Sequence, residues 1–122
     1  MTEIRNSYED GIHILKIMGE LVVDDVVDFV IQITPSLKDE PVLWDLTDAN
    51  FERLPTEDFI QLAMKMKNSP ESRAGAKVAL VGDTDLKYGM LRVYNAWLDT
   101  EETSLTVNTF RSVEEARKWI LF

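Results

Sequence analysis

The spacing of apolar residues changes repeatedly along the chain and predicts strands and helices in alternation. Short apolar or alternating runs are typical of strands, whereas apolar residues three and four positions apart are typical of helices with one buried side. The predicted strands span residues 4–8, 12–18, 41–46, 76–82 and 104–110. The predicted helices span residues 23–34, 86–98 and 112–120, with another that opens at residue 56 and fades at 68–70.

The first two predicted strands are joined by Glu9-Asp10-Gly11, and an Asp-Gly turn of this kind favours a β-hairpin. Both faces of the second strand are largely apolar, so this strand is expected to lie inside the sheet. One face carries Ile12, Ile14, Lys16 and Met18, and the other carries His13, Leu15 and Ile17.

Local residue types set the expected ends of the helices. Thr34-Pro35 is expected to stop the first helix, because the residue before proline is pushed out of the helical region. Residues 47–55 are expected to form a loop, and Thr56 is expected to cap the helix that follows. The run 83–85 supplies a cap for the third helix, and Ser112-Val-Glu-Glu115 is a capping-box pattern for the last.

Each helix carries apolar residues on one side, which is expected to cover the sheet. These residues are Val26, Val27, Phe29, Val30 and Ile33 in the first helix, Phe59, Ile60, Ala63, Met64 and Met66 in the second, and Met90, Leu91, Tyr94 and Leu98 in the third. Strands separated by such helices pair in parallel through right-handed crossovers. The sequence therefore predicts one α/β domain over residues 1–122. It is a sandwich of order β-β-α-β-α-β-α-β-α, with a mostly parallel sheet of four or five strands and about four helices.

The composition disfavours or excludes several classes of function. Thirteen Lys and Arg against 22 Asp and Glu give a net charge of −9, which disfavours binding to nucleic acids and to anionic membrane surfaces. The chain has no cysteine, so disulfides, thiolate zinc sites and cysteine nucleophiles are excluded. No signal peptide is evident, and no apolar run approaches the roughly 20 residues that span a bilayer. A cytoplasmic protein without a transmembrane segment is expected.

Several local phrases occur in order along nearly the whole chain. They are Gly19-Glu-Leu before the first helix, Val42-Leu-Trp-Asp-Leu46, Val78-Ala-Leu-Val-Gly-Asp83, and Phe110-Arg-Ser-Val-Glu-Glu-Ala-Arg-Lys-Trp119 within residues 107–119. With this order of elements, the sequence resembles the SpoIIAA-like family, which is related to STAS and SEC14 (CRAL-TRIO) domains. The resemblance implies a compact STAS-like fold but little assigned biochemistry.

The resemblance also implies a position at which to look for phosphorylation. In anti-sigma-factor antagonists, which are better understood relatives, a strand ending in Asp-Leu-Ser precedes an Asp-Ser-Ser-Gly stretch whose serine is phosphorylated at a helix N-terminus. Asp45-Leu-Thr47 resembles the first part, but the second part falls near Arg53-Leu-Pro-Thr56, where the acceptor motif is missing. Thr56 is the only local substitute, and we favour a structural role for it over that of a phosphoacceptor.

Three aspartates follow predicted parallel strands. Asp45, Asp48 and Asp83 belong to the end of the sheet where open α/β folds bind ligands, which suits a magnesium site or an acid–base pair. The alternative, which we favour, is that Asp45 and Asp48 bond to loop amides while Asp83 or Asp85 caps the third helix. His13 is the only histidine, which excludes multi-histidine metal sites, and its position in an apolar strand predicts packing rather than catalysis.

Aromatic residues offer two further interpretations. Trp44 and Trp119 are predicted to belong to the core. Tyr88 and Trp97 lie partly off the apolar side of the third helix, so they are candidates for a partner or self-association surface. A lining for an apolar cavity is the other interpretation, and its candidates are Trp44, Tyr88, Tyr94, Trp97 and Trp119.

These patterns favour a non-enzymatic regulatory or protein-interaction module without a cofactor, which acts through an unidentified protein partner or through self-association by the third helix. The alternative is a binding domain for a small apolar or lipid-like ligand, held between the sheet and residues 86–98. An enzyme ranks third, and its activity would depend on Asp45 or Asp83.

Overall fold

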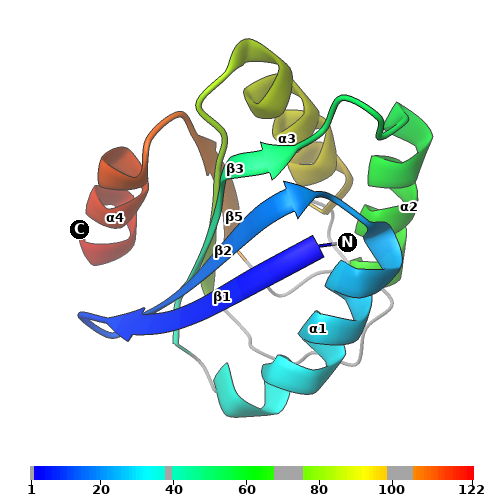
Figure 1. Cartoon of the computed structure of the whole chain (residues 1–122). Helices are drawn as coiled ribbons and strands as arrows, with labels where there is room; N and C mark the ends of the chain where they lie inside the picture. The colour runs from blue at the N-terminus through cyan, green and yellow to red at the C-terminus, as the bar shows by residue number, and fades with distance from the viewer. Residues whose placement is uncertain (1, 38–39, 68–75, 99–105) are drawn as a thin grey trace.

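Strands and helices follow one another in the predicted order (Figure 1). The computed structural model describes residues 2–37, 40–67, 76–98 and 106–122, without the side chains of residues 63, 66, 67, 97 and 98. The strands are β1 (Thr2–Glu9), β2 (Ile12–Glu20), β3 (Val42–Asn50), β4 (Lys77–Val81) and β5 (Thr106–Phe110). The helices are α1 (Val23–Leu37), α2 (Thr56–Lys67), α3 (Asp85–Leu98) and α4 (Val113–Leu121). The predicted α/β architecture is confirmed.

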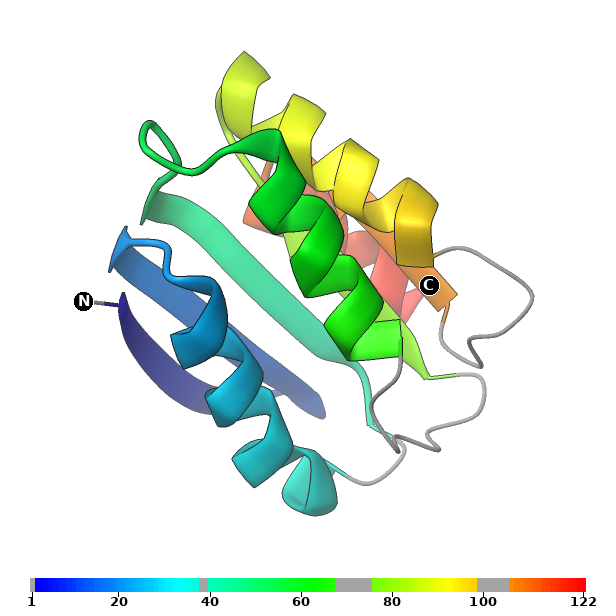
Figure 2. The same ribbon diagram turned by 90° about the vertical axis from the view of Figure 1, so that its right-hand side faces the viewer.

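All these strands join one sheet in the order β1-β2-β3-β4-β5. β1 and β2 form the predicted antiparallel hairpin, and β2 to β5 are parallel. Parallel crossovers are right-handed in nearly all proteins, so strands added in one direction carry their helices to one face. Figure 2 shows α1, α2 and α3 in a row over the sheet, and Figure 1 shows α4 on the opposite side.

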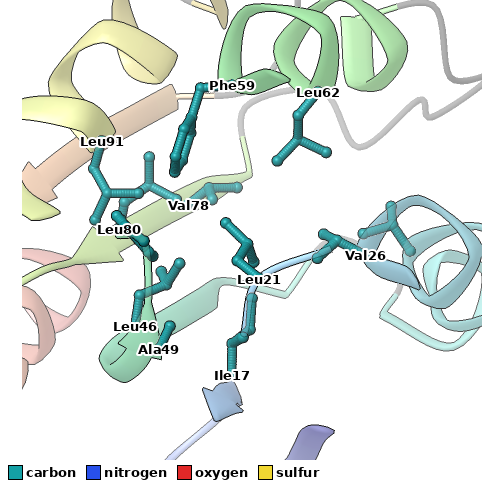
Figure 3. Close-up of a cluster of buried hydrophobic side chains, with 12 residues drawn as sticks. Ile17, Leu21, Val26, Leu46, Ala49, Phe59, Leu62, Val78, Leu80 and Leu91 are labelled. Carbon is teal, nitrogen blue, oxygen red and sulfur yellow. The ribbon is translucent and has the colours of Figure 1, made fainter. Parts of the chain in front are cut away.

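The main core fills the space between the sheet and the three crossover helices (Figure 3). Phe59 of α2 is 1% exposed and packs against Phe51, with the ring centroids 5.1 Å apart. Burying one such side chain contributes about 1.5–3 kcal/mol, so this cluster fixes the helices on the sheet. Its buried members are Ile17, Leu21, Val26, Val30, Leu46, Ala49, Phe51, Phe59, Leu62, Val78, Leu80 and Leu91.

α4 packs alone on the other face, mainly over β3, β4 and β5. Ser112 caps it as the capping box predicts, because the Ser112 hydroxyl accepts a hydrogen bond from the Glu115 amide at 3.2 Å. Partly buried Trp119 packs against Phe110, with ring centroids 5.4 Å apart. The buried residues of this second core are Ile12, Leu43, Ala79, Val81, Ala116 and Ile120.

α1 passes the expected stop at Thr34-Pro35 and ends at Leu37, so that prediction is wrong. Leu37 is 3% exposed and packs in a small cluster with Ile33 and Leu15 of β2. The free energy gained by burying Leu37 offsets the loss of one helix hydrogen bond at Pro35. This is a tertiary effect, which the rule about residues before proline does not include.

β3 continues to Asn50, so the expected loop over residues 47–55 is wrong at its start. Asp48 and Ala49 still pair with β2, after a shift in register. Ala49 is 2% exposed, and its burial keeps the extended chain against the core.

The inner side of α2 differs in part from the prediction. Leu62 is buried, whereas Met64 is 48% exposed. The side chains of Ala63 and Met66 lie outside the described residues. Thr56 is exposed and is the first residue of α2 rather than the residue before it. The predicted end of this helix at residues 68–70 and the start of the last strand at residue 104 also lie outside the described ranges.

Thr84, rather than Asp83 or Asp85, caps α3. The Thr84 hydroxyl accepts a hydrogen bond from the Lys87 amide at 3.2 Å. The cap therefore lies within the predicted run 83–85, but it is the threonine and not an aspartate. Asp83 and Asp85 pair with Lys87 and Arg111 instead.

Gly82 allows the end of β4 to lie close to the start of α3. A Cβ atom on Gly82 would lie 2.9 Å from the Lys87 Cβ and 3.0 Å from the Lys87 carbonyl carbon. The Gly82 amide also donates to the Phe110 carbonyl oxygen at 3.0 Å, which ties this position to β5. A larger residue would have to displace helix backbone.

We predict that Gly82→Ala lowers the free energy of unfolding by about 1–3 kcal/mol, because the methyl group overpacks the contact with Lys87. Gly89→Ala in α3 is the matched control, since a Cβ atom there meets nothing within 4 Å. Alanine at this helical position should raise the free energy of unfolding by about 0.5–1 kcal/mol. Urea unfolding measures both, and effects of the same sign would contradict the packing argument.

Candidate functional site

The three predicted aspartates lie near the carboxyl ends of β3 and β4. Asp45 is 8% exposed, and its Oδ1 accepts hydrogen bonds from the Thr47 amide at 3.0 Å and from the Thr47 hydroxyl at 2.7 Å. A buried carboxylate needs such partners, and here they are local. For Asp45, the geometry agrees with the amide-bonding alternative.

Asp48 pairs with Lys16 of the neighbouring strand. The Lys16 Nζ lies 2.9 Å from the Asp48 Oδ2. The hydrogen bond from Lys16 lowers the pKa of Asp48, and Asp48 in turn raises the pKa of Lys16. The nearby Asp45 carboxylate raises the pKa of Lys16 further. Lys16 therefore offsets the negative charge of two aspartates.

Lys87 connects β3 to the residues that follow β4. Its Nζ donates to the Thr47 carbonyl oxygen at 2.6 Å and lies 3.6 Å from the Asp83 Oδ1. The Lys87 side chain is only 16% exposed, so the ammonium is held within the strand ends. The three aspartates are thus divided between two lysines instead of meeting at one point.

In this arrangement each of the three carboxylates has a partner within the protein. A general base needs a carboxylate that can reach a substrate proton, and a divalent cation needs several oxygen ligands. Within the described ranges, no group of three or more acidic or histidine side chains is placed to hold a metal ion. Lys16 and Lys87 instead hold the carboxyl ends of β2, β3 and β4 together.

A second polar group lies at the opposite end of the parallel strands and was not predicted. The Tyr8 hydroxyl donates to the Glu40 Oε2, and the His13 Nε2 lies 3.4 Å from the Glu40 Oε1. The Tyr8 and His13 rings, 4.7 Å apart, face each other across the hairpin. The hydrogen bond to Glu40 raises the pKa of Tyr8. The hairpin was predicted, but the pairing of Tyr8 with His13 and the contact of both with Glu40 depend on strand registers that were not predicted.

Tyr88 of α3 lies beside two arginines. Arg92 belongs to α3, and Arg111 follows β5. The Arg111 guanidinium is 4.3 Å from the centroid of the Tyr88 ring, and that of Arg92 is 5.9 Å away. Arg111 also pairs with Asp85, whose Oδ1 lies 2.8 Å from the Arg111 Nη1. Tyr88 is half-buried in this group, whereas the side chain of Trp97, the other predicted surface residue, lies outside the described residues.

The solvent-facing side of α3 carries a stripe of uncharged residues beside the charged Asp85 and Arg92, which are also exposed. Four exposed positions with helical spacing define what we call the α3 face: Leu86, Gly89, Val93 and Ala96. Leu86 is 52% exposed and Val93 is 37% exposed. The outer side of a surface helix is normally polar or charged, so this stripe departs from the usual pattern.

Trp44 and Trp119 lie on opposite faces of the sheet. Trp44 packs edge-on against Phe29 of α1, with ring centroids 6.3 Å apart. Trp119 belongs to the core under α4. The two side chains therefore cannot line one cavity.

One solved structure with a similar arrangement is that of an uncharacterised protein from the DUF3478 family with a SpoIIAA-like fold, from Shewanella loihica PV-4. The match has a TM-score of 0.56 and covers 98% of this chain and 92% of that chain. The fold is SpoIIAA-like. At 20% sequence identity, the likeness concerns the fold alone. The sequence matches no protein-family model, and no curated protein matches it.

The SpoIIAA-like fold confirms the predicted architecture, whereas the positions suggested for function remain predictions. Thr56 presents an exposed hydroxyl at the first residue of α2. Of the helices described, none is long and apolar enough to cross a membrane.

We predict that Lys16→Met moves the pKa of Asp48 upward, toward its ordinary value of 3.8. Because the folded-state pKa is lowered, the stabilisation from this pair is present above that value and is lost as the pH falls through the lowered pKa. Carboxyl titration by NMR measures the shift. Lys65→Met, which removes the exposed partner of Asp24, is the control and should leave Asp48 unchanged. An Asp48 pKa that is the same in all three proteins would contradict the assignment.

Proposed function

We propose that this chain is a non-enzymatic regulatory or protein-interaction module that binds a protein partner through the α3 face. The observation that supports this most strongly is the exposed, uncharged stripe of Leu86, Gly89, Val93 and Ala96 on a chain of net charge −9. Binding of a partner that covers apolar surface of this kind is favourable, because it removes that surface from water. The outer side of α4 exposes the charged Glu114, Glu115 and Lys118, and its exposed apolar residue is Leu121 at the end of the helix.

The α3 face has features that suit close contact with another chain. Gly89 leaves the helix backbone accessible between the larger Leu86 and Val93 side chains, and Ala96, beyond Val93, adds only a methyl group. An apolar helix or loop can therefore approach the α3 backbone closely. Exposed hydrophobic residues with this spacing fit a helical partner.

The group around Tyr88 borders the α3 face and supplies polar recognition. Tyrosine and arginine are the residue types that most often dominate binding energy at interfaces. Arg111 is oriented by Asp85, and it restrains Tyr88 before any partner binds. A partner with an acidic residue opposite Arg92 would complement this border.

The absence of an enzymatic activity is part of the proposal and rests on the strand ends. The Asp45 Oδ1 accepts hydrogen bonds from Thr47, Asp48 pairs with Lys16, and Asp83 lies beside Lys87. Asp48 in particular is a poor general base, because the hydrogen bond from Lys16 lowers its pKa.

The small apolar ligand is the weaker candidate. The space suggested for it, between the sheet and α3, contains Leu91 packed with Leu80 and Phe59 (Figure 3). These side chains fill that space. The aromatic residues proposed to line a cavity therefore do not share one.

We predict that Val93→Glu abolishes most partner binding, because it places a charge at the centre of the α3 face. Ile31→Glu on α1 is the matched control, since Ile31 is also β-branched, helical and exposed, and the change in charge is the same. Quantitative affinity purification of the wild type and both variants from the source cells measures the effect.

The expected result is a set of proteins that co-purify with the wild type and Ile31→Glu and are lost, by on the order of tenfold or more, with Val93→Glu. Thermal unfolding of the purified variants checks that both are folded. Equal recovery with the two variants would contradict docking through the α3 face.

A further inference from the structure

β1 forms one edge of the sheet, and among the described strands only β2 pairs with it. Natural proteins protect such edges with proline, with bulges or with charges that repel a second strand. β1 contains no proline, and most of its residues are exposed. Its exposed charges include both signs.

The turn after β1 determines which backbone groups point outward. Asp10 and Gly11 have φ angles of 53° and 78°, which are typical of a two-residue type I′ turn. In such a hairpin the flanking residues Glu9 and Ile12 form a hydrogen-bonded pair, and the pattern alternates along the strands. By this alternation, the residues whose backbone groups face away from β2 are Thr2, Ile4, Asn6 and Tyr8.

One contact supports this assignment independently. The Thr2 amide donates to the Asp25 Oδ2 of α1 at 3.3 Å, although Gly19 is its neighbour in β2. An amide that pointed toward β2 would not reach α1. Ile4 and Asn6 therefore present unpaired amide and carbonyl groups along the edge.

The side chains at the edge are complementary to a second copy of themselves. Glu3 and Arg5 lie on the same face of β1 and are 64% and 70% exposed, and their own ion pair is long, at 3.9 Å. When two β1 strands meet antiparallel about an axis at Ile4, Glu3 of each copy faces Arg5 of the other. These positions are non-hydrogen-bonded pairs, where opposing side chains approach most closely.

Other registers that pair the outward groups are less favourable. An axis at Arg5 places the two arginines opposite each other, and an axis at Asn6 places Glu3 opposite Glu9. An axis at Ser7 pairs Arg5 with Glu9, but Glu9 already binds Arg117 at 3.1 Å. Like charges directly opposite each other destabilise a sheet, so the charges select the register at Ile4.

We propose that the β1 edge binds β1 of a second copy of this chain, antiparallel and centred at Ile4, so that two sheets become one. Backbone hydrogen bonds form between the two Ile4 residues, and the Asn6 amide donates to the Thr2 carbonyl oxygen of the other copy, while the Thr2 amide stays with Asp25 of its own chain. The two crossed Glu3–Arg5 pairs set the register. The contact is isologous and closed, since the outward backbone groups of each β1 strand pair with those of the other. It uses a different surface from the α3 face and is independent of the proposed partner.

Single charge reversals test the register. Sedimentation of the wild type should show a concentration-dependent dimer. Arg5→Glu or Glu3→Arg alone should raise its dissociation constant by on the order of tenfold, because each variant carries one sign of charge at both positions. An equimolar mixture of the two variants should dimerise again as a heterodimer, which native mass spectrometry resolves. A wild type that stays monomeric at about 1 mM overturns the proposal. So does a dimer that is lost with Val93→Glu but not with either charge reversal.

A proline substitution tests the backbone contact separately. Asn6→Pro removes an outward amide without an internal hydrogen bond, so the monomer should fold while the dimer is lost. Asn6→Thr keeps the amide and should keep the dimer. Circular dichroism reports folding for both. A dimer that survives Asn6→Pro overturns the proposal, and so does an Asn6→Pro chain that unfolds while Asn6→Thr is folded.

Discussion

The direction in which strands are added across the sheet is the constraint on which the other features depend. Each parallel crossover has the same hand, so α1, α2 and α3 occupy one face in chain order, and only α4 remains for the other. α3 is the last of the row, with α2 on one side and no described helix on the other (Figure 2). The hairpin places β1 at the opposite edge. The exposed α3 face and the open β1 edge therefore both follow from the topology.

The aspartates at the strand ends are paired within the protein. Parallel strands bring Asp45, Asp48 and Asp83 to the same end of the sheet, where many α/β proteins bind ligands. Here Lys16 and Lys87 enter from the neighbouring strand and helix and offset those charges. The two candidate surfaces for recognition are the α3 face and the β1 edge, which lie toward opposite edges of the sheet.

Much of the fold could be predicted from local pattern, because each element carries its own apolar period and turn residues. The errors occurred where distant contacts decide: burial of Leu37 extends α1 past Pro35, and pairing with β2 extends β3 past Thr47. The lysine partners of the aspartates could not be predicted, since the register that brings them together is tertiary. The uncharged side of α3 was not predicted, because the exposure of Leu86 and Val93 depends on where α3 lies in the row.

The central claim is that the α3 face is a recognition surface, and site-specific photo-cross-linking in the source cells tests it most directly. A photoreactive amino acid is placed at Val93, and the same group at Glu114 on the charged side of α4 serves as the control. The account predicts a discrete covalent adduct with another protein from position 93 and none from position 114. Adducts of the same pattern from both positions, or an adduct from position 114 alone, would contradict it.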